Sequence, residues 1–429
     1  MSQKDICPHN KINDQNYCVD CYQLIEDVDD YIRTSGGYGI TKSYAEEQKR
    51  SVSERLLKEK KLSLILDLDG TIVFTNPELC VPLENEEEPI TPEQGFYFEI
   101  PEQNAKVLIK FRDGIVTFME KVSKLYDIHV VTLGQKEYAF AIVNAINKLR
   151  DTPFITGDLV TAEDCSSVIV CDEKDTNDGL IDREETNERR SVKRSIPTMG
   201  KEEMQVIVDD RIDVWDNKNV VQICEYVPST NQVDTELLRV TEVLQNIYNK
   251  FYDEHIEDVK EILHSFRKKI LENKNLYFNR PNFSKMENGL LTQMIWKEIL
   301  RNSVMMGAKI QKFVYLDGPN KTDFIIDAKP MENIIAVKRE YLIYSWIFIN
   351  TLDEKPFEIS SESTEYKELS IDCVYDQTKH DSVLDDDPKM KRGLDDESSE
   401  DYSSSEDEND PEYLANLELF KQVMGKMKS

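Results

Sequence analysis

Two aspartates and a threonine directly follow an apolar run and have the types and spacing that phosphoryl transfer needs. The run 64–66 is short enough for a buried strand, and Asp67, Asp69, Gly70 and Thr71 come next. Side chains alternate along a strand, so Asp67 and Asp69 point to the same side, while Gly70 lets the backbone turn close to an anion. Two carboxylates this close repel each other unless a cation such as Mg²⁺ lies between them. The pattern predicts Asp67 as the nucleophile that forms an aspartyl-phosphate and Asp69 as the acid that protonates the leaving oxygen.

A second acidic pair follows another apolar strand further along the chain. Residues 206–208 run into Asp209 and Asp210, at what would be the carboxyl edge of a parallel sheet, where open α/β folds bind their ligands. This pair supplies the remaining ligands for a metal ion. Between the two acidic motifs, residues 128–134 predict a third strand, and the Thr132 hydroxyl at its end is a candidate donor to a phosphoryl oxygen. A lone threonine at a strand end usually has only a structural role. Thr132 becomes a candidate site residue because it lies between the two acidic motifs in the chain order.

Two amphipathic helices flank this third strand. The first is expected to start at Asp113 as N-cap and to repeat apolar residues from Ile115 to Leu125, and the second to run over 135–148. Strands that alternate with helices of this length predict an α/β fold with a doubly wound parallel sheet.

Taken together, these motifs resemble the haloacid-dehalogenase-like phosphatases, which carry the same Asp-x-Asp-x-Thr after a buried strand. A closer resemblance is to the phosphatases of the carboxy-terminal repeat domain of RNA polymerase II that have a breast-cancer-protein carboxy-terminal (BRCT) module after the catalytic domain. The stretches that carry this resemblance are 60–62, 111–114, 123–126, 135–139 and 208–215.

The resemblance implies a role for each motif residue. Asp67 would be the nucleophile, Asp69 the general acid and then base, and Thr132 a phosphate ligand. The side chains implied around the Mg²⁺ ion are those of Asp67, Asp69, Asp209 and Asp210. The implied activity is that of a Mg²⁺-dependent protein serine phosphatase acting on the RNA polymerase II repeat domain.

Three positions depart from the family pattern: Gly70 and Asp113, where the departure does not affect the chemistry, and a third position that leaves two candidates. The family has a phosphate-binding lysine upstream of the second acidic pair, and the best alignment places Arg190 there, with Lys193 as the alternative. Arginine keeps the positive charge, but its longer, planar guanidinium is not a conservative replacement in a tight site. Both residues are therefore candidates for the catalytic site.

Four potential metal ligands lie near the start of the chain. Cys7 and His9 are followed by Cys18 and Cys21, and tetrahedral zinc needs four such nitrogen or sulfur ligands. The spacing between Cys7 and His9 is tighter than in common zinc fingers, although the family often shows a similar pattern. A structural zinc site and free thiols in a mobile segment are the two interpretations.

Composition predicts a modular protein of a reducing compartment. The chain has 429 residues, enough for two or three domains, and its eight cysteines do not suggest a disulfide framework. A formal net charge of −30 argues against direct nucleic-acid binding and favours basic partners. The sequence lacks an apolar run long enough for a bilayer and an apolar secretory signal at its start, so no membrane contact is expected.

The motifs and composition divide the chain into five expected segments. These are an amino-terminal segment with a linker (1–45), the phosphatase domain (46–230), a helical connector (231–265), a small α/β domain that resembles a BRCT module (266–357) and an acidic disordered tail (358–429). In the BRCT-like segment the first strand runs into Asn279 and lacks the hydroxyl that phosphopeptide binding usually needs, although Lys338 is a candidate for the lysine of such a site.

The tail combines charge with a terminal apolar pattern. Residues 395–410 contain nine Asp or Glu and no Lys or Arg, and such a segment cannot bury enough apolar surface to fold alone. At its end Leu414, Leu417, Phe420 and Met424 fall on one helical face, typical of a segment that folds into a partner's groove. The family resemblance implies the large subunit of transcription factor IIF as that partner. The basic run 388–392 is a candidate nuclear import signal, so the nucleus is the expected location.

Two other functions compete with this prediction. A phosphatase of the same fold could act on another phosphoprotein or on a metabolite. A transcription scaffold with a weakened site is the second alternative, suggested only by Arg190, and the presence of all five motif residues from Asp67 to Asp210 argues against it.

Overall fold

The structure is a computed structural model. It describes residues 7–33, 38–85, 89–169, 189–212, 214–215, 219–228, 233–279, 289–316, 318–331, 334–365 and 374–375. These residues fall into two compact units, one ending at Leu263 and the other beginning at His264, and each unit is described by itself. The acidic run, the basic run 388–392 and the terminal apolar pattern lie outside the described residues, so the expectations for them stay predictions.

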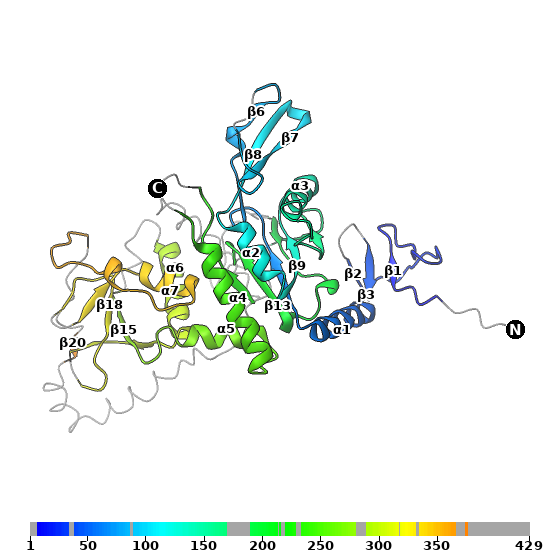
Figure 1. Cartoon of the computed structure of the whole chain (residues 1–429). Coiled ribbons are helices and arrows are strands. Elements are labelled where there is room, and N and C mark those ends of the chain that lie inside the picture. Colours follow the sequence, from blue (N-terminus) through cyan, green and yellow to red (C-terminus); the bar gives the residue numbers. More distant parts are fainter. Residues whose placement is uncertain are drawn as a thin grey trace, which may run out of the picture. The chain divides into compact units, whose positions relative to one another are not determined.

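A five-stranded parallel sheet forms the centre of the first unit (Figure 1). The strand order is β10-β9-β4-β13-β14, so the chain moves outward from β4 on one side of the sheet and returns to β13 on the other. This arrangement is a doubly wound sheet, and the expected α/β class is confirmed. The strands are β4 (Leu62–Leu66), β9 (Tyr126–Val131), β10 (Leu159–Val160), β13 (Gln205–Asp209) and β14 (Val220–Gln222). The reversal of strand order falls between β4 and β13, which is where open α/β sheets bind ligands.

Helices connect and cover these strands. They are α1 (Lys42–Glu59), α2 (Ile115–Val122), α3 (Lys136–Asn147), α4 (Glu236–Asp253) and α5 (Val259–Lys268), the last of which spans the boundary between the units. Helix α3 agrees with its expected range, whereas the start of α2 corrects a prediction. Gly114, not Asp113, is the N-cap of α2, because the Asp113 side chain instead accepts a hydrogen bond from the Asp234 backbone N–H at 3.3 Å.

An antiparallel arm interrupts the doubly wound pattern between β4 and α2. Its strands are β5 (Val73–Thr75), β6 (Val81–Pro82), β7 (Gly95–Ile100) and β8 (Ala105–Phe111). In Figure 1 β6, β7 and β8 extend beyond the parallel sheet, and β7 also contacts α3. No prediction covered this arm, although it starts directly after the Asp-x-Asp-x-Thr motif. A hairpin of β11 (Ser166–Ile169) and β12 (Arg189–Val192) leads back toward β13.

The amino-terminal segment forms a small antiparallel sheet that leads into α1. Its strands are β1 (Lys11–Ile12), β2 (Tyr31–Arg33) and β3 (Gly39–Thr41), in the order β1-β3-β2. Thr41, the last residue of β3, is also the N-cap of α1, and its hydroxyl accepts a hydrogen bond from the Tyr44 backbone N–H. The segment is therefore continuous with α1.

The second unit has its own parallel sheet, in the order β16-β15-β18-β19. These strands are β15 (Asn275–Phe278), β16 (Lys309–Gln311), β18 (Phe324–Ile326) and β19 (Ile335–Val337), and the helices are α6 (Gly289–Met305) and α7 (Glu340–Phe348). A second pair of strands joins β17 (Val314–Tyr315) to β20 (Val374–Tyr375). The core of the second unit includes Leu276, Trp296 and Tyr341. The strand expected to run into Asn279 is present as β15, and the resemblance of this unit to a BRCT module stays a prediction.

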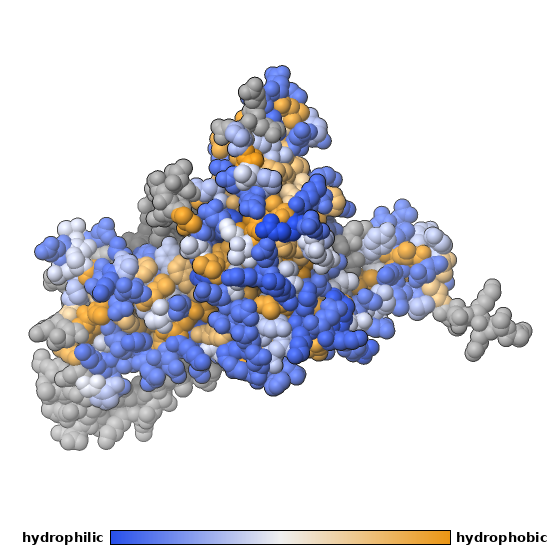
Figure 2. Space-filling view, viewed as in Figure 1, coloured by the Kyte–Doolittle hydropathy of each residue, from blue (hydrophilic) through white to orange (hydrophobic). Residues whose placement is uncertain are grey.

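The surface agrees with the strongly charged composition. The face shown in Figure 2 is largely hydrophilic, with smaller hydrophobic patches, including some on the arm. Within the described part of the chain, none of the helices is both long enough and apolar enough to span a bilayer.

Candidate active site

The two acidic motifs meet at the carboxyl ends of neighbouring strands. Strands β4 and β13 pair in register with Leu66 opposite Val208, so the next residues, Asp67 and Asp209, lie side by side. The Asp67 backbone N–H donates to the Val208 carbonyl at 3.0 Å and continues the ladder beyond β4. Asp67 is only 5% exposed and Asp209 is fully buried. The sheet itself thus brings together two carboxylates that are far apart in the sequence.

A lysine lies between these two carboxylates. Lys193 Nζ is 2.8 Å from Asp67 Oδ1 and 2.6 Å from Asp209 Oδ2, and the lysine is 2% exposed. Burial disfavours its charge, but Asp67 and Asp209 outweigh this effect and hold the pKa of Lys193 above its usual value. The Trp215 indole N–H also donates to Asp209 Oδ2, at 2.7 Å, so this oxygen has two donors.

Asp210 completes the acidic cluster and is held by the first motif. The Thr71 hydroxyl accepts from the Asp210 backbone N–H at 3.1 Å and lies 3.3 Å from Asp210 Oδ1. Gly70 has a φ of +76°, and a Cβ atom there would lie 2.9 Å from Asp210 Oδ2. Both the left-handed backbone and this close approach require glycine at the turn. The Asp-x-Asp-x-Thr loop and the second acidic pair therefore pack directly against each other.

The cluster has the chemistry of a site for a hard cation. Asp67, Asp209 and Asp210 each offer a carboxylate oxygen, and these atoms lie within 4.8 Å of one another. Burial raises the pKa of Asp67, with Asp210 adding to the rise and Lys193 opposing it. Burial and the neighbouring Asp67 raise the pKa of Asp209 to about 6. Carboxylates that repel each other in this way are stabilised by a cation, and an all-oxygen donor set suits Mg²⁺.

Asp69 lies beside this cluster and not within the three-carboxylate group. The Tyr138 hydroxyl donates to Asp69 Oδ1 at 2.5 Å. Although solvent reaches the Asp69 side chain, the surrounding protein desolvates the carboxylate and raises its pKa, an effect that the hydrogen bond from Tyr138 opposes. Its side chain therefore suits proton transfer better than the metal site implied by the family resemblance.

The hydroxyl of Thr132 can donate a hydrogen bond. It is buried at the end of β9, and its Oγ1 accepts a hydrogen bond from the Gly134 backbone N–H at 3.1 Å. That bond uses a lone pair of the hydroxyl and leaves its proton to donate elsewhere.

The two basic candidates, Lys193 and Arg190, lie in different positions. Lys193 contacts the carboxylates, while Arg190 lies three residues earlier in β12, where its backbone pairs with Val168. The side chain of Arg190 is outside the described part of the structure.

A buried arginine donates a hydrogen bond to the loop that follows β4. Arg112 is 1% exposed, and its guanidinium donates to the Thr71 carbonyl at 2.8 Å and to Asp234 Oδ2 at 2.9 Å. It also stacks over the Tyr226 ring, 5.1 Å from the ring centroid. Arg112, Tyr138 and Trp215 were not singled out as site residues from the sequence, although each lies in a stretch that carries the family resemblance.

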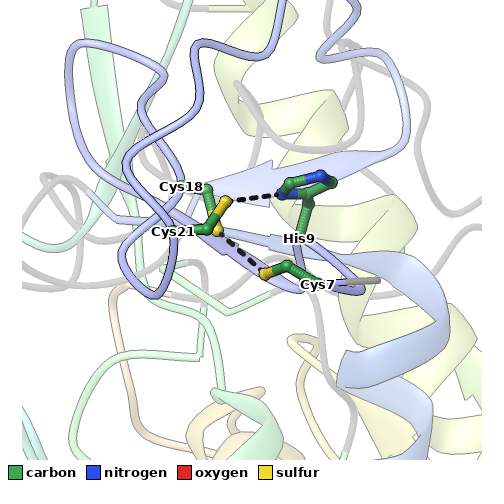
Figure 3. A group of neighbouring side chains, drawn as sticks. All are labelled: Cys7, His9, Cys18 and Cys21. Carbon is green, nitrogen blue, oxygen red and sulfur yellow. Dashed lines mark hydrogen bonds between the residues drawn. The ribbon is translucent and has the colours of Figure 1, made fainter. Parts of the chain in front are cut away.

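The amino-terminal cysteines and histidine form a second cluster, far along the chain from the first (Figure 3). Cys7 Sγ lies 3.6 Å from Cys18 Sγ, and Cys21 Sγ lies 3.3 Å from His9 Nδ1. One atom from each of the four side chains lies within 4.8 Å of the others. All six cysteines among the described residues are free thiols, so none of these contacts is a disulfide.

A doubly wound parallel sheet that presents Asp-x-Asp-x-Thr and a second acidic pair at its switch point defines a haloacid-dehalogenase-like phosphatase domain. The family model described as "NLI interacting factor-like phosphatase" matches residues 62–259, the part of the chain that holds the parallel sheet and both acidic motifs. Phosphatases of this superfamily generally use Mg²⁺, in agreement with the three-carboxylate cluster.

Relatives of known name share this part of the chain. The RNA polymerase II C-terminal domain phosphatase of Schizosaccharomyces pombe is 30% identical over 194 residues, which cover 42% of this chain and 24% of the relative. The protein of the same name from Caenorhabditis elegans is 22% identical over 366 residues, or 76% of this chain and 50% of the relative. This chain therefore spans half or less of the length of these relatives.

A solved structure of Fcp1, described as an essential RNA polymerase II CTD phosphatase, aligns over 72% of this chain and 98% of its own chain. The sequence identity is 20% and the TM-score is 0.49.

Proposed function

We propose that this protein is a Mg²⁺-dependent serine phosphatase of the RNA polymerase II carboxy-terminal repeat domain. The observation that carries the chemical part is the buried Lys193 between Asp67 and Asp209, at the point where the strand order reverses. Support for the substrate comes from the names of the relatives, both of which are C-terminal domain phosphatases of RNA polymerase II.

Binding of the phosphate group uses the donors that surround Asp67. Lys193 supplies a buried positive charge and Thr132 a hydroxyl proton for the phosphoryl oxygens. We assign the phosphate-binding role to Lys193 rather than Arg190, because its ammonium already contacts the proposed nucleophile at 2.8 Å. Bound to Asp67, Asp209 and Asp210, Mg²⁺ would supply the positive charge that allows a phosphate dianion to approach three carboxylates.

The chemistry proceeds in two steps. An oxygen of Asp67 attacks phosphorus, the bond from phosphorus to the serine oxygen breaks, and Asp69 gives its proton to that oxygen. In the second step Asp69 takes a proton from a water molecule as the water attacks the aspartyl-phosphate. The bond between phosphorus and the Asp67 oxygen then breaks, which releases phosphate, restores the Asp67 carboxylate and leaves Asp69 protonated for the next cycle.

Repeat peptides phosphorylated at single serines test the proposal. We expect the full chain to hydrolyse them faster than a phosphoserine peptide of equal charge and unrelated sequence. Equal rates on all peptides would point to another phosphoprotein or a metabolite as substrate. Absence of turnover on every peptide and on aryl phosphates would leave the scaffold alternative.

We further propose that Cys7, His9, Cys18 and Cys21 bind a structural zinc ion. Four ligands of the types that zinc prefers meet at one point, and the segment around them has little core of its own. Burial opposes ionisation of the Cys18 thiol, but hydrogen bonds from His9, from backbone N–H groups and from Cys7 outweigh it and lower its pKa to about 6. A thiolate at neutral pH is the form that coordinates zinc.

Native mass spectrometry of the full chain tests the zinc site. We expect one zinc ion per chain, lost in the double variant with Cys18→Ser and Cys21→Ser and kept in Cys80→Ser, which removes a thiol outside the cluster. Equal zinc content in all three proteins would refute the assignment.

We also propose that the acidic tail binds the large subunit of transcription factor IIF and that the protein acts in the nucleus. The support is the sequence alone: the acidic run at 395–410 would attract a basic surface, and Leu417 and Phe420 would anchor in its groove.

A further inference from the structure

A chain of three side chains ends at the proposed general acid. The Tyr138 hydroxyl lies 2.5 Å from Asp69 Oδ1 and 2.7 Å from Thr75 Oγ1. Tyr138 comes from α3 and Thr75 from β5, the first strand of the arm, so three separate elements meet at this point.

The direction of these hydrogen bonds follows from the number of protons. A tyrosine hydroxyl has one proton to donate, and an ionised carboxylate can only accept. Tyr138 therefore donates to Asp69, and the Thr75 hydroxyl donates to Tyr138. When Asp69 is protonated, the same donation to Oδ1 leaves its acidic proton on Oδ2.

The tyrosine ring is fixed by its surroundings. Phe98 of β7 packs against it edge to face, with 5.7 Å between ring centroids and 86° between ring planes. On another side the ring lies close to Gly134, where an added Cβ atom would be only 3.1 Å from Tyr138 Cδ1. Glycine at this position makes room for the ring, and the arm and α3 together hold the hydroxyl in place.

We propose that Tyr138, with Thr75 behind it, is a positioning residue that orients Asp69 so that Oδ2 faces the leaving group. This inference rests on the proposed phosphatase function. As the bond from phosphorus to the leaving oxygen breaks, the proton moves from Asp69 Oδ2 to that oxygen, and Asp69 is left as a carboxylate that Tyr138 stabilises. Removal of the hydroxyl frees the carboxyl group to rotate away from the leaving group.

The alternative is that Tyr138 only packs the arm against α3. The two roles differ in what they do to different leaving groups. A misplaced acid slows the expulsion of basic leaving groups and spares acidic phenols, which need no proton. A packing defect lowers all rates by a similar factor.

The test is the dependence of kcat/KM on the leaving group in the full-length Tyr138→Phe protein. This parameter covers the steps up to release of the alcohol or phenol, so hydrolysis of the aspartyl-phosphate does not affect it. Across aryl phosphates of rising phenol pKa, we expect a steeper fall of kcat/KM than in the wild type. For a phosphoserine peptide the loss should be about tenfold or more, a part of the 10² to 10⁴ that general acid catalysis contributes. For p-nitrophenyl phosphate the rate should change little.

Matched variants separate the effect of losing the Tyr138 hydroxyl from the effect of a packing defect. Thr75→Ser keeps the donor to Tyr138 and should behave as the wild type, while Thr75→Val should show a weaker form of the Tyr138→Phe pattern. Tyr248→Phe removes a tyrosine hydroxyl that donates to the Lys60 carbonyl, outside the chain of Thr75, Tyr138 and Asp69, and should leave the slope unchanged. In an Asp69→Asn background, Tyr138→Phe should add no further steepening, because its effect passes through Asp69.

An unchanged slope in Tyr138→Phe, with equal loss on all substrates or none, would overturn the inference while the phosphatase function stands. A wild type without activity on any phosphate ester would instead refute the proposed function itself.

Discussion

Each of the two units contains a parallel sheet, β10-β9-β4-β13-β14 in the first and β16-β15-β18-β19 in the second, and the strand ends of these two sheets carry different charges. In the first unit, β4 and β13 run into Asp67, Asp209 and Asp210, and one buried lysine contacts the first two. In the second unit, β18 runs into Asp327, whose carboxylate meets Arg339, with Arg339 Nε 3.0 Å from Asp327 Oδ2. The first arrangement gathers like charges and the second pairs opposite ones.

Further contacts hold the pair of Asp327 and Arg339 in the second unit. Asp327 Oδ1 accepts from the Arg339 backbone N–H at 2.9 Å, and the Asp327 carbonyl accepts from the Asn279 side chain at 3.0 Å. Arg339 also stacks on Trp296, 5.5 Å from the ring centroid. The pair of Asp327 and Arg339 is balanced in charge, whereas the crowded carboxylates of the first unit carry an excess of negative charge that a cation would balance. Similar sheets thus differ in function through the residues at their strand ends.

The sharpest test of this difference exchanges one aspartate in each sheet. Asp67→Asn should lower turnover of a phosphoserine peptide and of an aryl phosphate by a factor on the order of 10⁴ or more, because an amide cannot form the acyl-phosphate. Asp327→Asn should leave aryl phosphate hydrolysis unchanged. Steady-state kinetics of the two variants compares them directly, and near-normal activity of Asp67→Asn would refute the mechanism.

Removal of metal should have the next largest effect. Activity is expected to disappear in excess chelator and to return with Mg²⁺, since the three carboxylates would otherwise repel the phosphate. Thermal unfolding of the second unit's core, followed through a probe at Trp296, should not respond to Mg²⁺. Full activity in chelator would show that Lys193 alone compensates the acidic cluster.

Lys193→Ala should reduce kcat by about 10² to 10³, in the range seen when one charge-stabilising donor is lost. The variant also leaves Asp67 and Asp209 buried without their partner, so the free energy of unfolding should fall by about 3–5 kcal/mol. Arg190→Ala serves as the control and should change kcat little. If Arg190→Ala were the damaging variant and Lys193→Ala the mild one, the assignment of the phosphate-binding residue would have to be reversed.

The smallest effect on catalysis is expected from the tail. Deletion of the residues after Gly393 should leave hydrolysis of an aryl phosphate unchanged, yet weaken binding to the large subunit of transcription factor IIF. Binding of the intact chain should weaken with salt, because exposed charges are screened over about 8 Å at physiological ionic strength.

Calorimetry at two salt concentrations measures both effects. The double variant with Leu417→Ala and Phe420→Ala tests the apolar anchor separately from the charge. Binding that survives the deletion and the double variant would show that the tail does not contact this partner.

The position of the arm could not be predicted from the sequence. Strand β8 and its neighbours β5, β6 and β7 have local patterns of their own, but nothing in them indicates that they pack beside α3. Consequently Tyr138 looked like one more residue of an amphipathic helix. Its hydrogen bond to Asp69 joins residues 69 positions apart, and the arm adds Thr75 and Phe98 as further contacts of the same tyrosine.

The sequence by itself determined the α/β class and the carboxylates at the strand ends. These features are local, because alternation along a strand and the turn at Gly70 depend on neighbouring residues. Only the tertiary structure decided that Lys193 lies between Asp67 and Asp209, that Asp113 does not cap α2, and that Tyr138 holds Asp69. Each of these contacts joins segments distant in the chain, so it depends on how the sheet and the arm pack and not on any local pattern.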